Sequence, residues 1–157
     1  MKHTISIICD DVPGVMTRIS GLFSRRGFNI ESLSVGTTDK PGKSRFTIVV
    51  NGDDTVLEQV RKQLQKLINV INVWDYSEEA IVSREHALLK LKASRSNRSE
   101  LLQLVSSIQA RIIDSSGDIW TLEITGDTDD VSSFIDLFKH YEIVETIRTG
   151  KIALKRG

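Results

Sequence analysis

The 157-residue chain has only one cysteine and two prolines, and its charges balance, so several classes of protein are disfavoured at once. A single cysteine allows no internal disulfide, which fits a reducing compartment. Lysine plus arginine and aspartate plus glutamate number 21 each, and this zero net charge disfavours nucleic acid or an anionic membrane as a partner. No apolar run approaches the roughly 20 residues that a membrane-spanning helix needs.

The beginning of the chain shows no targeting signal, because Met1–Ile5 enters a strand pattern at once. We therefore expect the chain to work in the cytoplasm, or in the plastid stroma if an organelle encodes it. Cys9 ends the same apolar strand. It is predicted to be a buried, inert thiol, since a nucleophilic thiol needs an activating neighbour.

The chain also lacks a recognisable catalytic or metal-binding motif. Its three histidines are scattered, with no His/Cys spacing typical of a metal site, and no glycine-rich nucleotide-binding sequence occurs. The acidic groups at Asp53–Asp54 and Asp127–Asp130 stand where helices are expected to start, and carboxylates cap helix N-termini. A binding module is therefore favoured over an enzyme, and neither a metal nor a cofactor is expected in this chain.

Hydrophobic periodicity predicts the same order of elements twice. In the first half we expect strands at 4–9, 30–37, 45–50 and 68–76, with helices at 13–26 and after 51–54. In the second half we expect strands at 86–93, 111–115, 120–125 and 142–149, with helices that start near 99 and 127. Both halves have the order βαββαβ, the split arrangement of a ferredoxin-like sheet, so the predicted fold class is α+β with two ferredoxin-like domains. The polar stretch 78–85 is interpreted as a linker between domains at 1–77 and 86–157.

The most informative stretch is Asp10–Leu33, which combines a strand exit, a tight turn, one helix and the start of a second strand. Pro13 is expected in the first helical turn, and the free N–H groups at the Gly14 end of the helix form an anion site. Asn29 offers a neutral amide, and a strand packed beside the first strand would bring it back toward that site. Together these groups fit a small molecule with a carboxylate and a second polar group, such as an amino acid. A capped helix with a polar turn is the alternative.

The segments Pro13–Val15, Gly21–Phe23 and Arg25–Leu33 resemble the effector loop of ACT domains, which sense amino acids. More specifically, they resemble the small regulatory subunits of acetolactate synthase (acetohydroxyacid synthase). Chain length and the rest of the pattern extend the resemblance over nearly the whole chain. The second half lacks a Pro-Gly after its first strand and an Asn in the place of Asn29, so we expect one effector domain and one similar domain with another role.

The resemblance implies a function. Such subunits bind the large catalytic subunit of acetolactate synthase, raise its activity and make it sensitive to branched-chain amino acids, usually valine. Thiamine diphosphate, magnesium and FAD belong to the catalytic partner, so the resemblance implies no cofactor in this chain. ACT domains of this family pair side by side, which implies a homodimer with the effector at the interface of the pair.

Carried over by position, the implied effector site has five residues. Gly14 and Val15 would present backbone N–H groups to the effector carboxylate. Asn29 and Ile30 of the other copy would meet its ammonium and its side chain. Asp11 departs from the family pattern, since many bacterial members have Asn there, and its carboxylate would either attract the effector ammonium or repel the effector carboxylate.

Three alternatives stay open on the sequence. One is a stand-alone ACT-type amino-acid sensor acting on another enzyme, against which the motif at 25–33 argues. Another is an RNA-binding sheet, which needs exposed strand aromatics and a basic surface, whereas the strand at 45–50 has one aromatic residue. The third is an acylphosphatase-like enzyme, whose anion-cradling loop is a poor match for the acidic Asp10 and Asp11.

Overall fold

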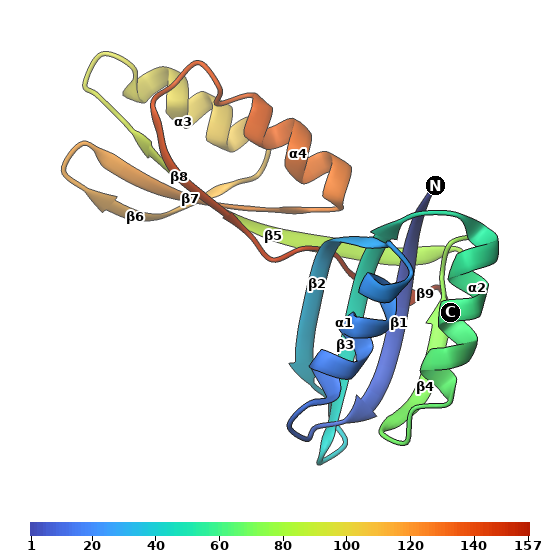
Figure 1. The fold of residues 1–157 in the computed structure, drawn as a ribbon. Coiled ribbons are helices and arrows are strands. Elements are labelled where there is room, and N and C mark those ends of the chain that lie inside the picture. The colour runs from blue at the N-terminus through green and yellow to red at the C-terminus, as the bar shows by residue number, and fades with distance from the viewer. The chain divides into compact units, whose positions relative to one another are not determined.

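The computed structural model covers residues 1–157, and the chain folds into two compact units (Figure 1). Unit 1 comprises Met1–Val82 together with Lys151–Gly157, and unit 2 comprises Ser83–Gly150. No helix in either unit has the length and apolar character needed to cross a membrane.

Unit 1 is built on a four-stranded sheet with two helices. Its first six elements are β1 (Lys2–Asp10), α1 (Val15–Arg25), β2 (Asn29–Thr37), β3 (Lys43–Asn51), α2 (Asp54–Gln65) and β4 (Val70–Asp75). The strands lie in the order β2-β3-β1-β4, and every neighbouring pair is antiparallel. Apolar residues of both helices and of the sheet form one buried core. The predicted βαββαβ order and ferredoxin-like arrangement are confirmed.

The α1 helix follows its sequence pattern but starts two residues later than expected. The apolar positions at helical spacing are all buried, namely Val15, Ile19, Leu22 and Phe23. Pro13 stands before the helix, because Gly14 is the N-cap and has a left-handed backbone with φ of 88°. At the other end Gly27 has φ of 75°, and the Phe28 N–H donates to the Phe23 carbonyl over 3.0 Å, so the helix ends in a left-handed glycine.

The last strand of unit 1, β9 (Ile152–Lys155), is absent from the sequence prediction. It pairs with β5, and beside it the Arg156 N–H donates to the Ala80 carbonyl over 2.8 Å. Ala153 is buried, and the Arg45 guanidinium donates to its carbonyl over 3.4 Å and to the Tyr76 hydroxyl over 3.0 Å. A four-residue strand whose partners are distant in sequence carries no local signal of where it pairs.

The compact units also divide the chain differently from the predicted domains at 1–77 and 86–157. The β5 strand (Ile81–Lys92) begins inside the stretch 78–85, which its composition had assigned to a linker. Residues 151–157 belong to unit 1. The polar residues at the start of that stretch hide the fact that the apolar pair Ile81 and Val82 opens a long strand.

Unit 2 repeats the arrangement of unit 1. After β5 its elements are α3 (Arg98–Ser107), β6 (Arg111–Ser116), β7 (Ile119–Gly126), α4 (Thr128–Asp136) and β8 (Ile143–Arg148). The strand order is β6-β7-β5-β8, which matches the order in unit 1. A second core gathers buried residues from the sheet and both helices. The predicted second βαββαβ arrangement is therefore confirmed.

A shared irregularity aligns the two units residue by residue. Near their ends, β1 and β5 each shift register against the last strand of their sheet. Just after that shift the Asp10 N–H donates to the Asn69 carbonyl over 2.8 Å, and the Lys92 N–H donates to the Glu142 carbonyl over 3.0 Å. Asp10 therefore corresponds to Lys92, and Asn69 corresponds to Glu142.

Candidate effector site

The exit of β1 is held by an ion pair. Lys43 Nζ lies 2.5 Å from Asp10 Oδ1, and the Asn69 amide donates to Asp10 Oδ2 over 3.3 Å. The hydrogen bond from Lys43, and then the one from Asn69, lower the pKa of Asp10 below its ordinary value. Asp11 follows with its N–H bonded to the Gly42 carbonyl over 2.9 Å, while its exposed carboxylate forms no ion pair. Asp10 is thus part of the loop's framework, and Asp11 is the carboxylate that remains accessible.

The N-terminus of α1 is open to an anion. Gly14 is the N-cap, and no side chain caps the helix. In α2, by contrast, the Asp53 carboxylate accepts from the N–H groups of Thr55 and Val56 over 2.8 and 3.2 Å. The side chain of Val15 is buried in the core, so this residue offers only its backbone N–H to a ligand. Uncapped N–H groups at the positive end of a helix favour a negatively charged group.

Arg18 adds a full positive charge to this site and was missed by the sequence analysis. Its Nη1 donates to the Asn69 side-chain oxygen over 2.7 Å. Its Nη2 lies 3.4 Å from the point that a Cβ on Gly14 would occupy, so the guanidinium sits over the start of the helix. The available signal was spacing, because a residue four positions after the N-cap lies on the same helix face one turn later.

Asn29 and Ile30 do not lie near Gly14 in the same chain. Asn29 pairs with Asn51, which in turn pairs with Lys2 at the start of β1. Gly14 instead follows the end of β1, so the two residues are at opposite ends of the sheet, roughly 27 Å apart over eight strand residues. The expectation that a neighbouring strand returns Asn29 to the loop within one chain is therefore wrong, because β1 and β2 are both antiparallel to β3 and so start at the same end of the sheet.

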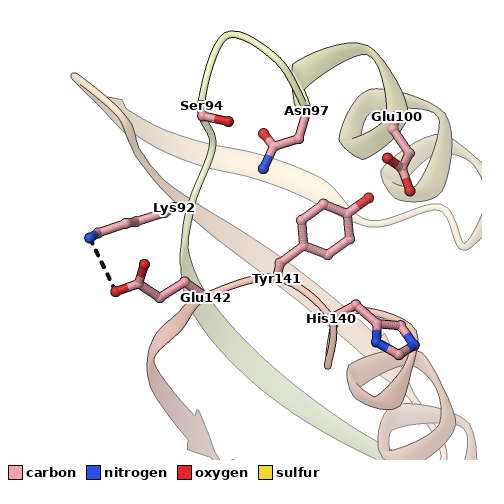
Figure 2. A pocket seen from close by; sticks show the side chains of 7 residues that line it. All are labelled: Lys92, Ser94, Asn97, Glu100, His140, Tyr141 and Glu142. Carbon is pink, nitrogen blue, oxygen red and sulfur yellow. Dashed lines mark ion pairs between the residues drawn. The ribbon is translucent and has the colours of Figure 1, made fainter.

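Two hollows of ligand size, one in each unit, are not lined by any predicted effector residue. In unit 1 a hollow of about 480 Å³ is lined by Ile8, Thr37, Thr38, Asp39, Lys40, Lys43, Arg45, Ile71 and Asn72. In unit 2 a hollow of about 420 Å³ is lined by Lys92, Ser94, Asn97, Glu100, His140, Tyr141 and Glu142 (Figure 2).

The chain shows no arrangement for metal binding or thiol chemistry. No group of three or more His, Cys, Asp or Glu side chains is placed to hold a metal ion. Cys9 is buried, as predicted, and burial followed by the charges of Asp10 and Asp11 raises its thiol pKa. A raised thiol pKa keeps the sulfur protonated and unreactive.

Comparison with known proteins covers both units. Residues 5–72 match the family described as AHAS small subunit-like ACT domain, and residues 84–157 match the family described as small subunit of acetolactate synthase. The chain is 52% identical over 157 residues to a protein of Archaeoglobus fulgidus described as a probable acetolactate synthase small subunit, covering 100% of this chain and 98% of that one. It is 44% identical over 155 residues to the acetolactate synthase small subunit of Mycobacterium bovis, covering 99% and 92%.

A solved structure agrees with these matches. The crystal structure of the acetolactate synthase small subunit from Thermotoga maritima superposes with a TM-score of 0.92 at 40% identity, covering 100% of this chain and 98% of that one. The fold, both family matches and the full-length relatives indicate the same family as the motif at 13–33. The chain belongs to the acetolactate synthase small-subunit family.

Proposed function

We propose that the chain binds valine, or a related branched-chain amino acid, between two copies of its N-terminal ACT domain and thereby regulates acetolactate synthase. As a small subunit the chain is regulatory and not catalytic. In this proposal it binds the large catalytic subunit, raises its turnover and makes that turnover sensitive to the amino acid. Thiamine diphosphate, magnesium and FAD stay with the catalytic partner, in the cytoplasm or the plastid stroma.

The single observation that carries the proposal is the uncapped N-terminus of α1 with Arg18 over it. An α-amino acid always carries a carboxylate, and this surface combines free backbone N–H groups with a guanidinium. Charge-assisted hydrogen bonds contribute roughly 1.5–3 kcal/mol each. Two such bonds from the Gly14–Val15 backbone and one from Arg18 are enough to bind a small ligand at micromolar to millimolar concentration.

The location of Asn29 supports a site that is shared between two copies. The β2 strand is a free edge of its sheet, and an unpaired edge readily accepts another strand. A twofold axis at that edge makes the two β2 strands antiparallel, because symmetric dimer contacts use the same surface on both copies. Asn29 and Ile30 of one copy then lie toward the Thr37 end of β2 in the other copy, which is the Gly14 end of the sheet.

Charge placement suggests the orientation of the effector. The exposed Asp11 carboxylate and the neutral amide of the other copy's Asn29 are acceptors for an ammonium group. Arg18 and the helix N-terminus attract the carboxylate. A branched aliphatic side chain would contact Ile30, which is partly buried against the core. In this arrangement Asp11 attracts the effector ammonium instead of repelling the effector carboxylate.

Steady-state kinetics with the matching catalytic subunit test the proposal. We expect no acetolactate synthase activity from the chain alone, a rise in turnover when it is added to the catalytic subunit, and a fall when valine is then added. Sedimentation should show at least twice the chain mass. Binding to the catalytic subunit without any change in rate would remove the activator role. Valine binding without any binding to the catalytic subunit would favour a stand-alone ACT-type sensor.

A further inference from the structure

The hollow in unit 2 is built from three segments that meet at one end of its sheet (Figure 2). Lys92 and Ser94 come from the end of β5 and the loop after it, and Asn97 and Glu100 come from the start of α3. The 140–142 segment before β8 closes the other side with Tyr141 at its centre. A volume of about 420 Å³ is within the range of small-molecule sites.

The wall of the hollow contains one buried polar atom that the chain itself leaves without a hydrogen bond. Asn97 Oδ1 is buried and has no hydrogen-bond partner, and Asn97 does not cap α3 with its side chain. The Tyr141 hydroxyl is also buried and is directed to the Glu100 carboxylate; burial, and then the hydrogen bond to Glu100, raises its pKa to about 12. Buried polar groups are nearly always paired in folded proteins, so the unpaired Asn97 oxygen in the wall of this hollow indicates a polar ligand.

Charges of opposite sign stand on the two sides of the hollow. Lys92 Nζ pairs with a Glu142 carboxylate oxygen over 3.1 Å, but both side chains are more than half exposed. Exposed pairs of this kind are weak, so the ammonium of Lys92 is available to a ligand anion. Glu100 stands on the other side of the Tyr141 ring from Lys92 (Figure 2).

We propose that this hollow is a second ligand site, for a small zwitterion of the α-amino-acid class. The ligand ammonium donates to Asn97 Oδ1 and to the Glu100 carboxylate, against the ring of Tyr141. The ligand carboxylate accepts from Lys92 and from the Ser94 hydroxyl. The proposal does not depend on the effector site at Gly14, because all of these residues lie in unit 2.

Amide NMR of the full-length chain tests the inference with three matched probes. L-Alanine carries both charged groups, ethylamine lacks the carboxylate and propionate lacks the ammonium. We expect L-alanine at millimolar concentration to shift the signals of residues 92–100 and 140–142. Each single-charge probe should bind about tenfold more weakly, since a lost charge-assisted contact is worth about one factor of ten. Equal binding of all three probes, or unmoved signals in these residues, would overturn the proposal.

Two pairs of variants separate this site from a general charge effect. Lys92→Met should weaken L-alanine binding about tenfold, whereas Lys90→Met, which removes a similar ion pair to Glu145 two residues earlier, should not. Glu100→Gln should weaken binding, and Glu145→Gln should not. Melting temperatures confirm that all four variants are folded. Equal effects within either pair of variants would contradict the assignment. NMR shifts confined to unit 1 would also contradict the site in unit 2, but they would leave the proposed effector site at Gly14 unaffected.

Discussion

The two strand-to-helix loops, at Asp10–Gly14 in unit 1 and at Lys92–Asn97 in unit 2, occupy the same place in the same fold but differ in charge and length. In unit 1 the acidic Asp10 pairs with a lysine, and in unit 2 the basic Lys92 pairs with a glutamate. The second loop is one residue longer and ends in Asn97 instead of a glycine.

The arginines that follow these loops also differ in role. Arg18 lies over the start of its helix and bonds to a side chain. Arg98 is directed to the strand ends and donates to the Ala93 carbonyl over 3.1 Å and to the Gly117 carbonyl over 3.3 Å. One fold therefore presents an uncapped helix start in one unit and a side-chain-lined hollow in the other. Function lies in the residues placed on the fold, not in the fold itself.

The largest expected effect is on valine inhibition, when Gly14 at the start of α1 is replaced. Gly14→Asp places a carboxylate at the proposed position of the effector carboxylate. We expect valine inhibition to weaken about 100-fold or more, because close like charges cancel most of the binding energy of a weak ligand. Activation of the catalytic subunit should persist, since the apolar face of α1 is untouched. Valine inhibition curves with the catalytic subunit measure both effects.

Gly14→Asn is the matched control for this change. It has the same size and the same strain at a positive φ, but no charge. Inhibition should therefore weaken less in the Asn variant than in the Asp variant. Equal loss in both would mean that Gly14 matters only for backbone shape.

The next prediction compares two buried polar residues, His3 in β1 and Glu85 in β5. Arg148 donates to both Glu85 oxygens over 2.7 and 3.1 Å. Removing one member of such a pair leaves the other member without its charged partner. Glu85→Gln should therefore lower the unfolding free energy by about 2 kcal/mol. His3→Gln should cost less, because the Asp54 partner of His3 is exposed. Urea unfolding of both variants decides the order.

The same ion pair predicts a pH dependence for unit 2. Burial alone would raise the pKa of Glu85, but the hydrogen bonds from Arg148, Thr128 and the Gly150 backbone, together with the charge of Arg148, outweigh burial and hold the pKa below its ordinary value of 4.5. A carboxyl with a lowered pKa in the folded state adds stability above its unfolded pKa, and that stability is lost as the pH falls through the folded value. Wild type should therefore lose stability below pH 4.5 more steeply than Glu85→Gln.

A smaller effect on valine inhibition is expected from Arg18, whose guanidinium lies over the start of α1. Arg18→Gln removes the charge beside the effector carboxylate, and valine inhibition should weaken about tenfold. Arg25→Gln, in the last turn of the same helix, removes a charge far from Gly14 and should leave inhibition unchanged. If both variants behave alike, the contribution of Arg18 is a general charge effect and not a contact.

The smallest expected effect concerns the ion pair between Lys43 and Asp10. Lys43→Met removes the hydrogen bond that contributes most to the lowered pKa of Asp10, so that pKa should rise toward its ordinary value. Carboxyl NMR titration measures the change directly. Lys92→Met removes the corresponding pair in unit 2 and should leave Asp10 unaffected.

Local patterns predicted most of the fold and part of the site. The helical spacing from Val15 to Phe23 and the alternation in the strands specify which faces are buried, and burial decides the sheet arrangement. The β9 strand and the opposite location of Asn29 depend on pairing between distant segments, which periodicity does not encode. Arg18 was not predicted because an exposed arginine on a helix is ordinary. Only the structure shows that the Arg18 guanidinium lies over the helix start at Gly14.

Co-expression of two differently tagged variants tests the shared site most directly. Gly14→Asp and Asn29→Ala each abolish valine binding in this account, but a mixed dimer keeps one site with Gly14 from one copy and Asn29 from the other. We predict that purified mixed dimers bind valine with about half the capacity of wild type, since one of two equivalent sites is intact. If both residues came from the same copy, every site would carry one defect. Mixed dimers that bind no valine would then contradict the account.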